Sequence, residues 1–304
     1  MKNKKSRDKR RTSLFIFFCI FIFIAAGLFA YFAFKKIEFN PAEFFNNSSP
    51  QVTQRPEEPA AADDEDAAPP QDETDEYAAV PFYLHEKRSR YISYHAMRPT
   101  LGIETIVWHV NADLHLTMFE DAKILDDENP LLVNPFNRLP ETYEPAELVE
   151  VDSYGRLVTP ETRTAFFLLR DAIRLEGYDV SVQSAYRTYE YQAGLYERSG
   201  GSGTVAPPGF SEHHTGRAVD LWGPGGLLDN DPGKPPSNEG IWVANNCHRF
   251  GFIVRYPAGA DHITGYPYEP WHITYVGEEI SNAMHVQNIL TLEEFLAKNP
   301  GIKK

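Results

Sequence analysis

Apolar and polar residues after about residue 130 alternate with two periods, one typical of helices and one typical of strands. The clearest helix is predicted from Thr159 to Gly177, because Thr159 and Pro160 match an N-cap followed by proline in the first turn. Its apolar stripe consists of Phe166, Leu169, Ile173 and Leu175. Alternation over 218–222 predicts a strand with one face toward a site. Further strands are expected over 178–184, 252–256 and 272–276, and further helices near 189–197, 239–250, 278–286 and 292–297. Helices mixed with short strands predict an α+β domain with a small antiparallel sheet flanked by helices.

The N-terminal residues follow a different pattern. Residues 14–34 contain no charged side chain and are about as long as the ~20 residues that cross a bilayer as a helix. Residues 1–13 carry seven Lys and Arg side chains against the single Asp8. This asymmetry predicts a basic cytoplasmic tail, one transmembrane signal-anchor helix over 14–34 in the cell membrane, and an extracellular location for the rest of the chain. The alternative is a cleaved signal peptide, because Ala30 and Ala33 lie near the end of the apolar run.

Acidic residues dominate the segment that follows. The formal net charge of the 304 residues is -14, and much of it lies between residues 57 and 76 among Ala and Pro. Residues 35–79 are therefore predicted to be a disordered acidic linker, followed by a helical preamble over 80–129 and the main domain over 130–304. Within the preamble, residues 105–116 mix helical and strand spacing. Nucleic acid is not an expected partner, since no basic face occurs outside the N-terminal tail.

The chain has two cysteines, and neither is expected to form a disulfide. Cys19 lies inside the apolar run, where the two phenylalanines before it disfavour lipid attachment. Cys247 lies at the end of a predicted helix, a position that favours a buried and inert thiol. The exported domain is expected to be stable through core packing, with a metal ion as a further contributor.

Two short segments late in the chain supply side chains suited to a catalytic zinc ion. His213 and Asp220 lie in the first segment, and Glu269 and His272 lie in the second. Two imidazoles and one carboxylate are sufficient protein ligands, and they leave a fourth position for water. Glu269 can then act as the base that takes the proton of that water. His214 is the alternative ligand, but adjacent residues of an extended segment point in opposite directions, which favours His213.

The spacing of these residues resembles a known enzyme family. The resemblance is carried by Ser211-x-His213-x-x-Gly216-x-Ala218-x-Asp220 followed by Glu269-x-Trp271-His272, and it extends over roughly residues 130–277. This pattern is similar to the VanY-type D-alanyl-D-alanine carboxypeptidases of the zinc peptidase family M15, a group that includes L,D-carboxypeptidases. The resemblance implies a hedgehog/D,D-peptidase-like fold, in which a small antiparallel sheet flanked by helices carries the zinc site.

The resemblance also implies roles for single residues. It implies that His213, Asp220 and His272 bind Zn²⁺ as the cofactor and that Glu269 is the catalytic base. It implies that Arg187 lies over the zinc site and stabilises charge on the carbonyl oxygen in the transition state. A guanidinium suits this role, because it stays cationic and presents several donors. A structural ion pair is the alternative for Arg187.

Weaker expectations concern the substrate pocket. Tyr186, Gln192 and Ser211 are expected to line the part that receives the terminal carboxylate of the substrate. Two features depart from the family pattern: His214 stands where Gln is common, and residues 207–209 form an unusually rigid Pro-Pro-Gly segment. The edge of the pocket is therefore expected to differ.

The function expected from these observations is that of a membrane-anchored, extracellular zinc carboxypeptidase. The resemblance implies that its substrate is the peptidoglycan stem peptide, from which it is expected to remove the C-terminal D-alanine. Cleavage between two D-alanines is preferred, with L,D-cleavage of a tetrapeptide as a second reading. The alternative is a non-catalytic, zinc-stabilised cell-wall-binding protein, although a structural zinc needs no base such as Glu269. A serine-type carboxypeptidase is not supported, because Ser6 to Lys9, in the basic tail, is the only Ser-x-x-Lys and Lys-Thr-Gly is missing.

Overall fold

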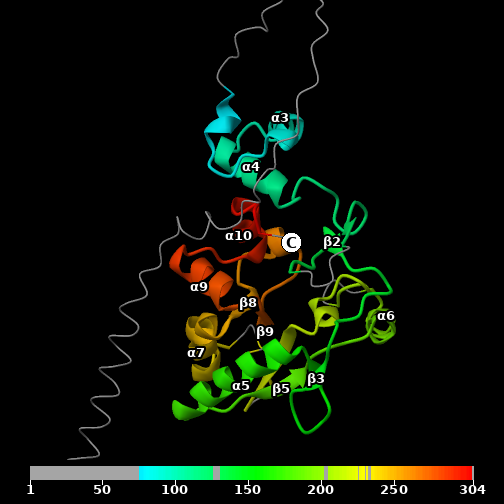
Figure 1. Cartoon of the computed structure of the whole chain (residues 1–304), viewed down its shortest axis with the longest axis vertical. Coiled ribbons are helices and arrows are strands. Elements are labelled where there is room, and N and C mark those ends of the chain that lie inside the picture. The colour runs from blue at the N-terminus through cyan, green and yellow to red at the C-terminus, as the bar shows by residue number, and fades with distance from the viewer. Residues whose placement is uncertain are drawn as a thin grey trace, which may run out of the picture. The chain divides into compact units, whose positions relative to one another are not determined.

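A five-stranded antiparallel sheet lies at the centre of the part of the chain that supplies the candidate zinc ligands. The structure is a computed structural model that describes residues 75–125, 131–201, 205–224, 226–229, 231 and 234–302, all within one unit that spans residues 69–304. The sheet has the order β5 (Ser181–Ser184), β6 (Ala218–Gly223), β9 (Glu269–Tyr275) and β8 (Phe252–Tyr256), and β7 (Gly226–Leu227) pairs with the end of β6. Figure 1 labels β5, β8 and β9 of this sheet. All of these pairs are antiparallel. The predicted small antiparallel sheet with helices is confirmed.

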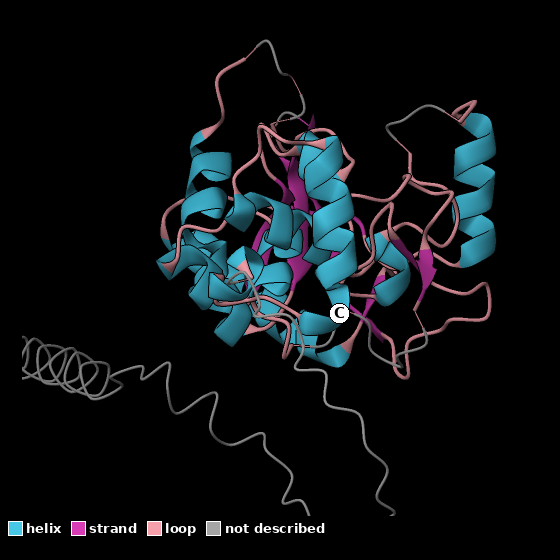
Figure 2. Cartoon of the chain, turned by 90° about the horizontal axis from the view of Figure 1, so that it is seen from above, coloured by secondary structure: helices cyan, strands magenta, loops and turns pink. Residues whose placement is uncertain are grey.

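One face of this sheet carries the main hydrophobic core. Val219 and Leu221 of β6 are fully buried in it, and the alternating direction of strand side chains turns Asp220 to the opposite face. The core is closed by α5 (Pro160–Leu175), α7 (Asn238–Asn246) and the 3-10 helix η4 (Cys247–Phe250). Figure 2 shows helices grouped around the strands. The sheet thus separates an apolar core from the face that bears Asp220.

Helix α5 follows its sequence pattern closely. Thr159 is the N-cap, and its side-chain oxygen accepts a hydrogen bond from the backbone N–H of Thr162 at 3.4 Å. Phe166, Leu169 and Ile173 are buried in the core as predicted. Leu175 was expected to belong to the same stripe, but its side chain is 89% exposed, because it lies on the opposite side of the last turn.

Most of the other predicted elements are present with shifted ends. The strand β8 and the helix α9 (Glu278–Val286) have the predicted bounds, and α6 (Tyr189–Arg198) and α10 (Leu292–Lys298) are each one residue longer. The strand expected over 178–184 is shortened to β5, and the helix expected over 239–250 is divided into α7 and η4. The strand expected from His272 begins earlier, at Glu269.

Short helices precede the sheet domain. They are η1 (Glu76–Ala79), η2 (His85–Lys87), α3 (Arg88–Met97) and α4 (Ile103–Asn111). Their buried residues, among them Tyr77, Tyr91 and Ile106, form a separate apolar cluster. The mixed pattern over 105–116 is therefore helical up to Asn111, and η1 lies in the last residues that the sequence assigned to the linker. The side chain of Asn111 donates to the backbone carbonyl of Ala297 in α10 at 3.2 Å, which joins the preamble to the C-terminal helix.

Small strand pairs and turns complete the described chain. They are β1 (Lys123–Ile124) with β2 (Asn137–Arg138), β3 (Val149–Glu150) with β4 (Leu157–Val158), the 3-10 helix η3 (Glu212–Thr215) and α8 (Asp261–Thr264). Among the described residues, none of the helices has the length and apolar character that crossing a membrane requires. Residues 14–34, to which the transmembrane prediction applies, lie outside them, as does most of the predicted linker.

Candidate metal and catalytic site

The structure brings the three predicted zinc ligands together on the sheet face opposite the core. His213 lies in η3, and Asp220 and His272 are paired directly across β6 and β9. One ligand atom of each residue lies within 4.8 Å of the others, and all three residues are buried. The imidazole Nε2 of His213 is 3.2 Å from Oδ2 of Asp220, and Nδ1 of His272 is 3.1 Å from Oδ1.

These distances fit a single zinc ion. Two ligands at the usual 2.0 to 2.1 Å from zinc lie about 3.3 Å apart in a tetrahedral arrangement. Oδ1 of Asp220 is buried and has no hydrogen-bond partner among the described residues, as expected for an atom whose partner is a metal ion. The donor set of two imidazoles and one carboxylate also suits zinc. The residues present therefore fit the metal that the sequence implies.

The backbone turn of η3 selects His213 over His214. The prediction of an extended segment here was wrong, because residues 212–215 form a 3-10 turn that ends at Gly216 with φ 68°. His213 donates from Nδ1 to the carbonyl of Ala185 at 2.7 Å, which leaves Nε2 to face Asp220. His214 turns away, and its Nδ1 donates to the carbonyl of Arg187 at 2.7 Å. His213 therefore remains the favoured metal ligand, but the physical reason is the 3-10 turn and not an extended segment.

Glu269 reaches the same site through an irregularity of the sheet. Residues three apart on a regular strand point to opposite faces. The register between β8 and β9 shifts between Val254 and Tyr256, so that four residues of β9 oppose two of β8. As a result, Oε2 of Glu269 lies 3.6 Å from Nδ1 of His272. Burial raises the pKa of the Glu269 carboxyl to about 7, near the value that suits a general base at neutral pH.

Burial and neighbouring charges also shift the pKa values of the ligand side chains. Burial lowers the pKa of His213 to about 4, and Arg187 acts in the same direction, so this imidazole is neutral. Burial raises the pKa of Asp220, but the imidazoles of His213 and His272 outweigh it and hold the pKa below its usual range. Burial lowers the pKa of His272, but Asp220 and Glu212 outweigh it and raise the pKa to about 9. A metal ion that binds here releases the proton of His272.

Arg187 is held beside the ligands by three hydrogen bonds. Its Nη2 donates to Oδ2 of Asp220 at 3.0 Å, its Nε donates to Oγ of Ser184 at 3.0 Å, and its Nη1 donates to Oε1 of Gln192 at 3.3 Å. The guanidinium also lines the cavity that contains His213 and Glu269. The ion pair considered for Arg187 is therefore present, and its place in the cavity agrees with the predicted contact to substrate.

Comparisons with known proteins identify the family. Residues 155–278 match the model of the VanY family, described as D-alanyl-D-alanine carboxypeptidase. The chain is 34% identical to the putative carboxypeptidase YodJ of Bacillus subtilis over 203 residues, which cover 59% of this chain and 74% of YodJ. The chain belongs to the VanY family.

Two further relatives support this assignment. A D-alanyl-D-alanine carboxypeptidase of Enterococcus faecalis is 35% identical, with 55% of this chain and 65% of that protein covered. The solved structure of the LdcB LD-carboxypeptidase matches with a TM-score of 0.53 and 33% identity, over 59% of this chain and 91% of that one. The chain thus belongs by descent with the VanY-type D-alanyl-D-alanine carboxypeptidases of the M15 family, and these two relatives are named as carboxypeptidases.

In this VanY-family chain, the cavity lined by the predicted zinc ligands and Glu269 has a volume of about 270 Å³. Of the three residues expected to bind the substrate carboxylate, Gln192 and Ser211 line the cavity and Tyr186 does not. The amide of Gln192 is used inside the protein, because Oε1 accepts from Arg187 and Nε2 donates to the carbonyl of Ala206 at 2.8 Å. Gln192 therefore holds Arg187 in place, and direct contact with substrate stays a prediction for it and for Ser211.

Three aromatic residues of the cavity wall were not among the predicted site residues: Tyr256, Tyr266 and Trp271. Tyr256 is buried, with its ring centroid 4.9 Å from that of His272. Tyr266 is held by a hydrogen bond from its hydroxyl to the carbonyl of Phe210 at 3.1 Å. Trp271 belongs to the motif that carries the family resemblance, but no role was predicted for any of the three, because an aromatic residue beside a strand or turn is more often part of a core than of a site.

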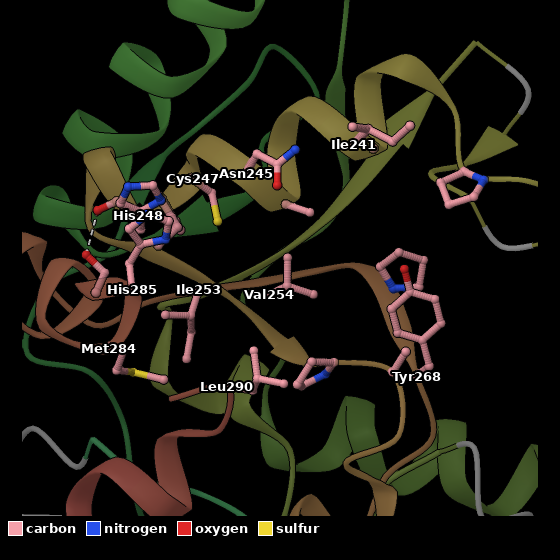
Figure 3. Close-up of a pocket in the computed structure, with 18 of the residues that line it drawn as sticks. Ile241, Asn245, Cys247, His248, Ile253, Val254, Tyr268, Met284, His285 and Leu290 are labelled. Carbon is pink, nitrogen blue, oxygen red and sulfur yellow. Dashed lines mark hydrogen bonds between the residues drawn. The ribbon is translucent and has the colours of Figure 1, made fainter. Parts of the chain in front are cut away.

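A second cavity, of about 410 Å³, lies between α7, β8 and α9 (Figure 3). None of the predicted catalytic or ligand residues lines it. The rings of His248 and His285 stack there with centroids 3.6 Å apart, and the hydroxyl of Ser281 donates to the carbonyl of His248 at 2.7 Å (Figure 3). Cys247 is buried as predicted, and burial raises the pKa of its thiol to about 12. This thiol is therefore not activated as a nucleophile.

Proposed function

We propose that this chain is a zinc-dependent carboxypeptidase that removes the C-terminal D-alanine from peptidoglycan stem peptides. The single observation that carries the proposal is the convergence of His213, Asp220 and His272 with the Glu269 carboxylate in one cavity. Membership of the VanY family supports it independently.

The chemistry divides among the side chains of the cavity. A zinc ion held by the triad supplies an electrophile and lowers the pKa of water. Glu269, whose pKa of about 7 leaves a large share of carboxylate at neutral pH, takes the proton of the attacking water and delivers it to the leaving amine. Arg187 provides fixed positive charge for the oxygen that becomes negative in the transition state, because its guanidinium is already oriented by its three partners.

The preferred scissile bond joins two D-alanines. The relative from Enterococcus faecalis is a D-alanyl-D-alanine carboxypeptidase, whereas LdcB is an LD-carboxypeptidase. In this proposal either reaction releases a C-terminal D-alanine, and His213, Asp220, His272, Glu269 and Arg187 would have the same roles in both. The family match to a D-alanyl-D-alanine carboxypeptidase model favours the D,D reaction.

The proposal includes a location. The uncharged run over 14–34 and the basic residues before it support a single-pass anchor with a cytoplasmic N-terminus. The acidic residues 35–79 would then act as a spacer with a typical reach of about 30 to 40 Å if they behave as a flexible coil. The catalytic domain would act on the part of the cell wall nearest to the membrane.

The experiment that tests the proposal is digestion of defined stem peptides. The zinc-loaded protein is incubated with a pentapeptide and with a tetrapeptide, with and without chelator, and the products are identified by mass spectrometry. We expect release of D-alanine, predominantly from the pentapeptide, and no release with chelator. Release from neither peptide by a zinc-loaded, folded chain would refute the proposal.

A matched variant separates the enzyme from the alternative, a wall-binding protein with a structural zinc. Glu269→Gln keeps the size of the side chain but cannot take a proton, so it should keep zinc and substrate affinity and lose at least 100-fold in turnover, a typical effect of removing a general base. A wall-binding protein would bind peptidoglycan equally well with either residue and would release no D-alanine.

A further inference from the structure

Glu212, which lies between Ser211 and the ligand His213, is one of the most completely buried carboxylates of the described chain. Its side chain is 2% exposed and is not part of the cavity wall. Oε2 accepts a hydrogen bond from the hydroxyl of Thr274 at 2.5 Å. The same oxygen lies 3.7 Å from Nε2 of His272, the ring nitrogen on the side away from Asp220. Glu212 thus lies on the side of the His272 ring that faces away from Asp220.

The other oxygen of Glu212 begins a buried chain of charges. Oε1 accepts from Nε of Arg255 at 2.5 Å, and the two terminal nitrogens of Arg255 donate to the two oxygens of Glu293 at 2.9 and 2.6 Å. Arg255 and Glu293 have no exposed side-chain surface. Asn134 donates from Nδ2 to Oε1 of Glu293 at 3.0 Å, and Glu293 lies on α10. A continuous polar path therefore connects the C-terminal helix to His272.

The charge of this path is unbalanced. It contains two carboxylates, those of Glu212 and Glu293, and one guanidinium, that of Arg255, which contacts both of them. Buried charge is costly unless it is compensated. Besides Arg255 and the hydroxyl of Thr274, the imidazole of His272 lies close to Glu212.

The imidazole of His272 needs this partner as well. Its Nε2 is buried and has no hydrogen-bond partner within normal range among the described residues. A separation of 3.7 Å to Oε2 of Glu212 is slightly too long for a hydrogen bond, and a small rotation of the ring closes it. A proton on Nε2 that faces Glu212 leaves the lone pair on Nδ1, the atom that faces Asp220.

We propose that Glu212 is a positioning residue for the metal site: it holds His272 with Nδ1 toward the metal, and Arg255 and Glu293 in turn hold Glu212. This inference rests on the proposed zinc-dependent function. If Glu212 has this role, α10 helps to support the metal site, although α10 follows the predicted ligands in the sequence and contributes none of them. It also explains why a strand residue as polar as Arg255 is fully buried.

The test is the zinc affinity of Glu212→Gln, measured by competition with a chromogenic chelator in the full chain without substrate. This variant removes one negative charge from a path that has one in excess, so the Arg255–Glu293 pair stays balanced and the fold should persist. We expect zinc affinity to fall by about 10 to 100-fold, the usual effect of removing a partner behind a histidine ligand. The cobalt-substituted variant should show shifted visible absorption bands, because a reoriented ring changes the ligand field.

Two further variants keep the result interpretable. Glu293→Gln acts on His272 only through Arg255 and Glu212, so it should weaken zinc binding less, by severalfold. Glu294→Gln changes the neighbouring residue of α10, which pairs with Lys298 at 3.1 Å near the surface, and should leave zinc affinity unchanged. If Glu212→Gln fails to fold, the zinc affinity of Glu293→Gln becomes the test. An unchanged zinc affinity in Glu293→Gln then overturns the proposal.

The outcomes separate this inference from the proposed function. Wild-type zinc affinity and cobalt spectrum in Glu212→Gln, in a chain that releases D-alanine, would overturn the positioning role alone. Weakened zinc binding in the variant, with no D-alanine released by the wild-type chain, would uphold the positioning role and refute the enzyme. A wild-type chain that binds no zinc refutes both.

Discussion

At the scale of single residues, Glu269 is the group whose protonation should control the rate. Burial is the main cause of its raised pKa of about 7, opposed by His272. A cation bound by the neighbouring triad acts in the same direction as His272, because positive charge favours the carboxylate. The working pKa of Glu269 is therefore expected at or below about 7.

This leads to a prediction for the pH profile. A general base must be deprotonated, so kcat/KM for a stem pentapeptide should rise with pH on the acid side and level off above the working pKa of Glu269. The measurement is D-alanine release at saturating zinc from pH 5 to 8, with zinc occupancy checked at each pH because protonated histidines release metal. A rate that falls between pH 5 and 7 at constant occupancy would show that Glu269 acts as an acid in the limiting step.

Residue types and spacing were sufficient to predict which side chains meet, but not why they meet. His213 was preferred on the assumption of an extended segment, whereas the 3-10 turn of η3 decides the orientation of both histidines. Glu212 was overlooked, since a glutamate beside a ligand reads as an ordinary polar residue. Its importance depends on Arg255 and Glu293, which lie about 40 and 80 residues further along the chain, and no local pattern reports such contacts.

At the scale of elements, the start of α5 is tied to the loop that carries His213. The backbone N–H of Thr159 donates to the carbonyl of Gly216 at 2.9 Å, while the Thr159 side chain caps the helix. A Cβ at Gly216 would lie 2.9 Å from a methyl carbon of Leu148 and 3.2 Å from that of Thr159. Thr159, which caps α5, is thus packed against Gly216 at the end of η3, the turn that carries His213.

The cap gives a prediction for stability. Thr159→Ala removes the oxygen that satisfies the N–H of Thr162 and should lower the free energy of unfolding by about 1 kcal/mol. Thr159→Ser keeps that oxygen and is the matched control. Urea denaturation of both variants checks the effect, and the capping role is excluded if the Ala variant is as stable as the Ser variant.

Helices and strands with a clear hydrophobic periodicity were predicted well. Elements whose ends depend on contacts with distant parts of the chain were not. The amphipathic stripe of α5 and the alternation of β6 follow directly from the sequence, and β8 has the predicted bounds. The early start of β9 at Glu269 could not be predicted, because a proline such as Pro270 is uncommon inside a paired strand and the register shift against β8 depends on the partner strand. That irregularity is what brings Glu269 to His272.

At the scale of the whole molecule, α10 connects regions that are distant in the sequence. It carries Glu293, which pairs with Arg255, and its Ala297 accepts from Asn111 of the preamble. The hydrophobic residues of α10 are buried in a cluster with Leu132 and Ile253. The end of the chain thus supports the sheet, the preamble and, by our inference, the metal site together.

The N-terminal segment gives the prediction that belongs to the whole chain. Residues 14–34 are long and apolar enough to hold the protein in a bilayer, whereas every residue assigned to catalysis or metal binding lies between Arg187 and His272. A chain without residues 1–34 should therefore remain in the soluble fraction and keep the full-length kcat/KM for a soluble pentapeptide within about twofold, since the chemistry requires only the cavity residues. The full chain should sediment with membranes after a carbonate wash, and detergent should release it. A full chain that stays soluble would refute the anchor, and a truncated chain that folds and binds zinc but has lost activity would show that the N-terminal residues contribute to the reaction itself.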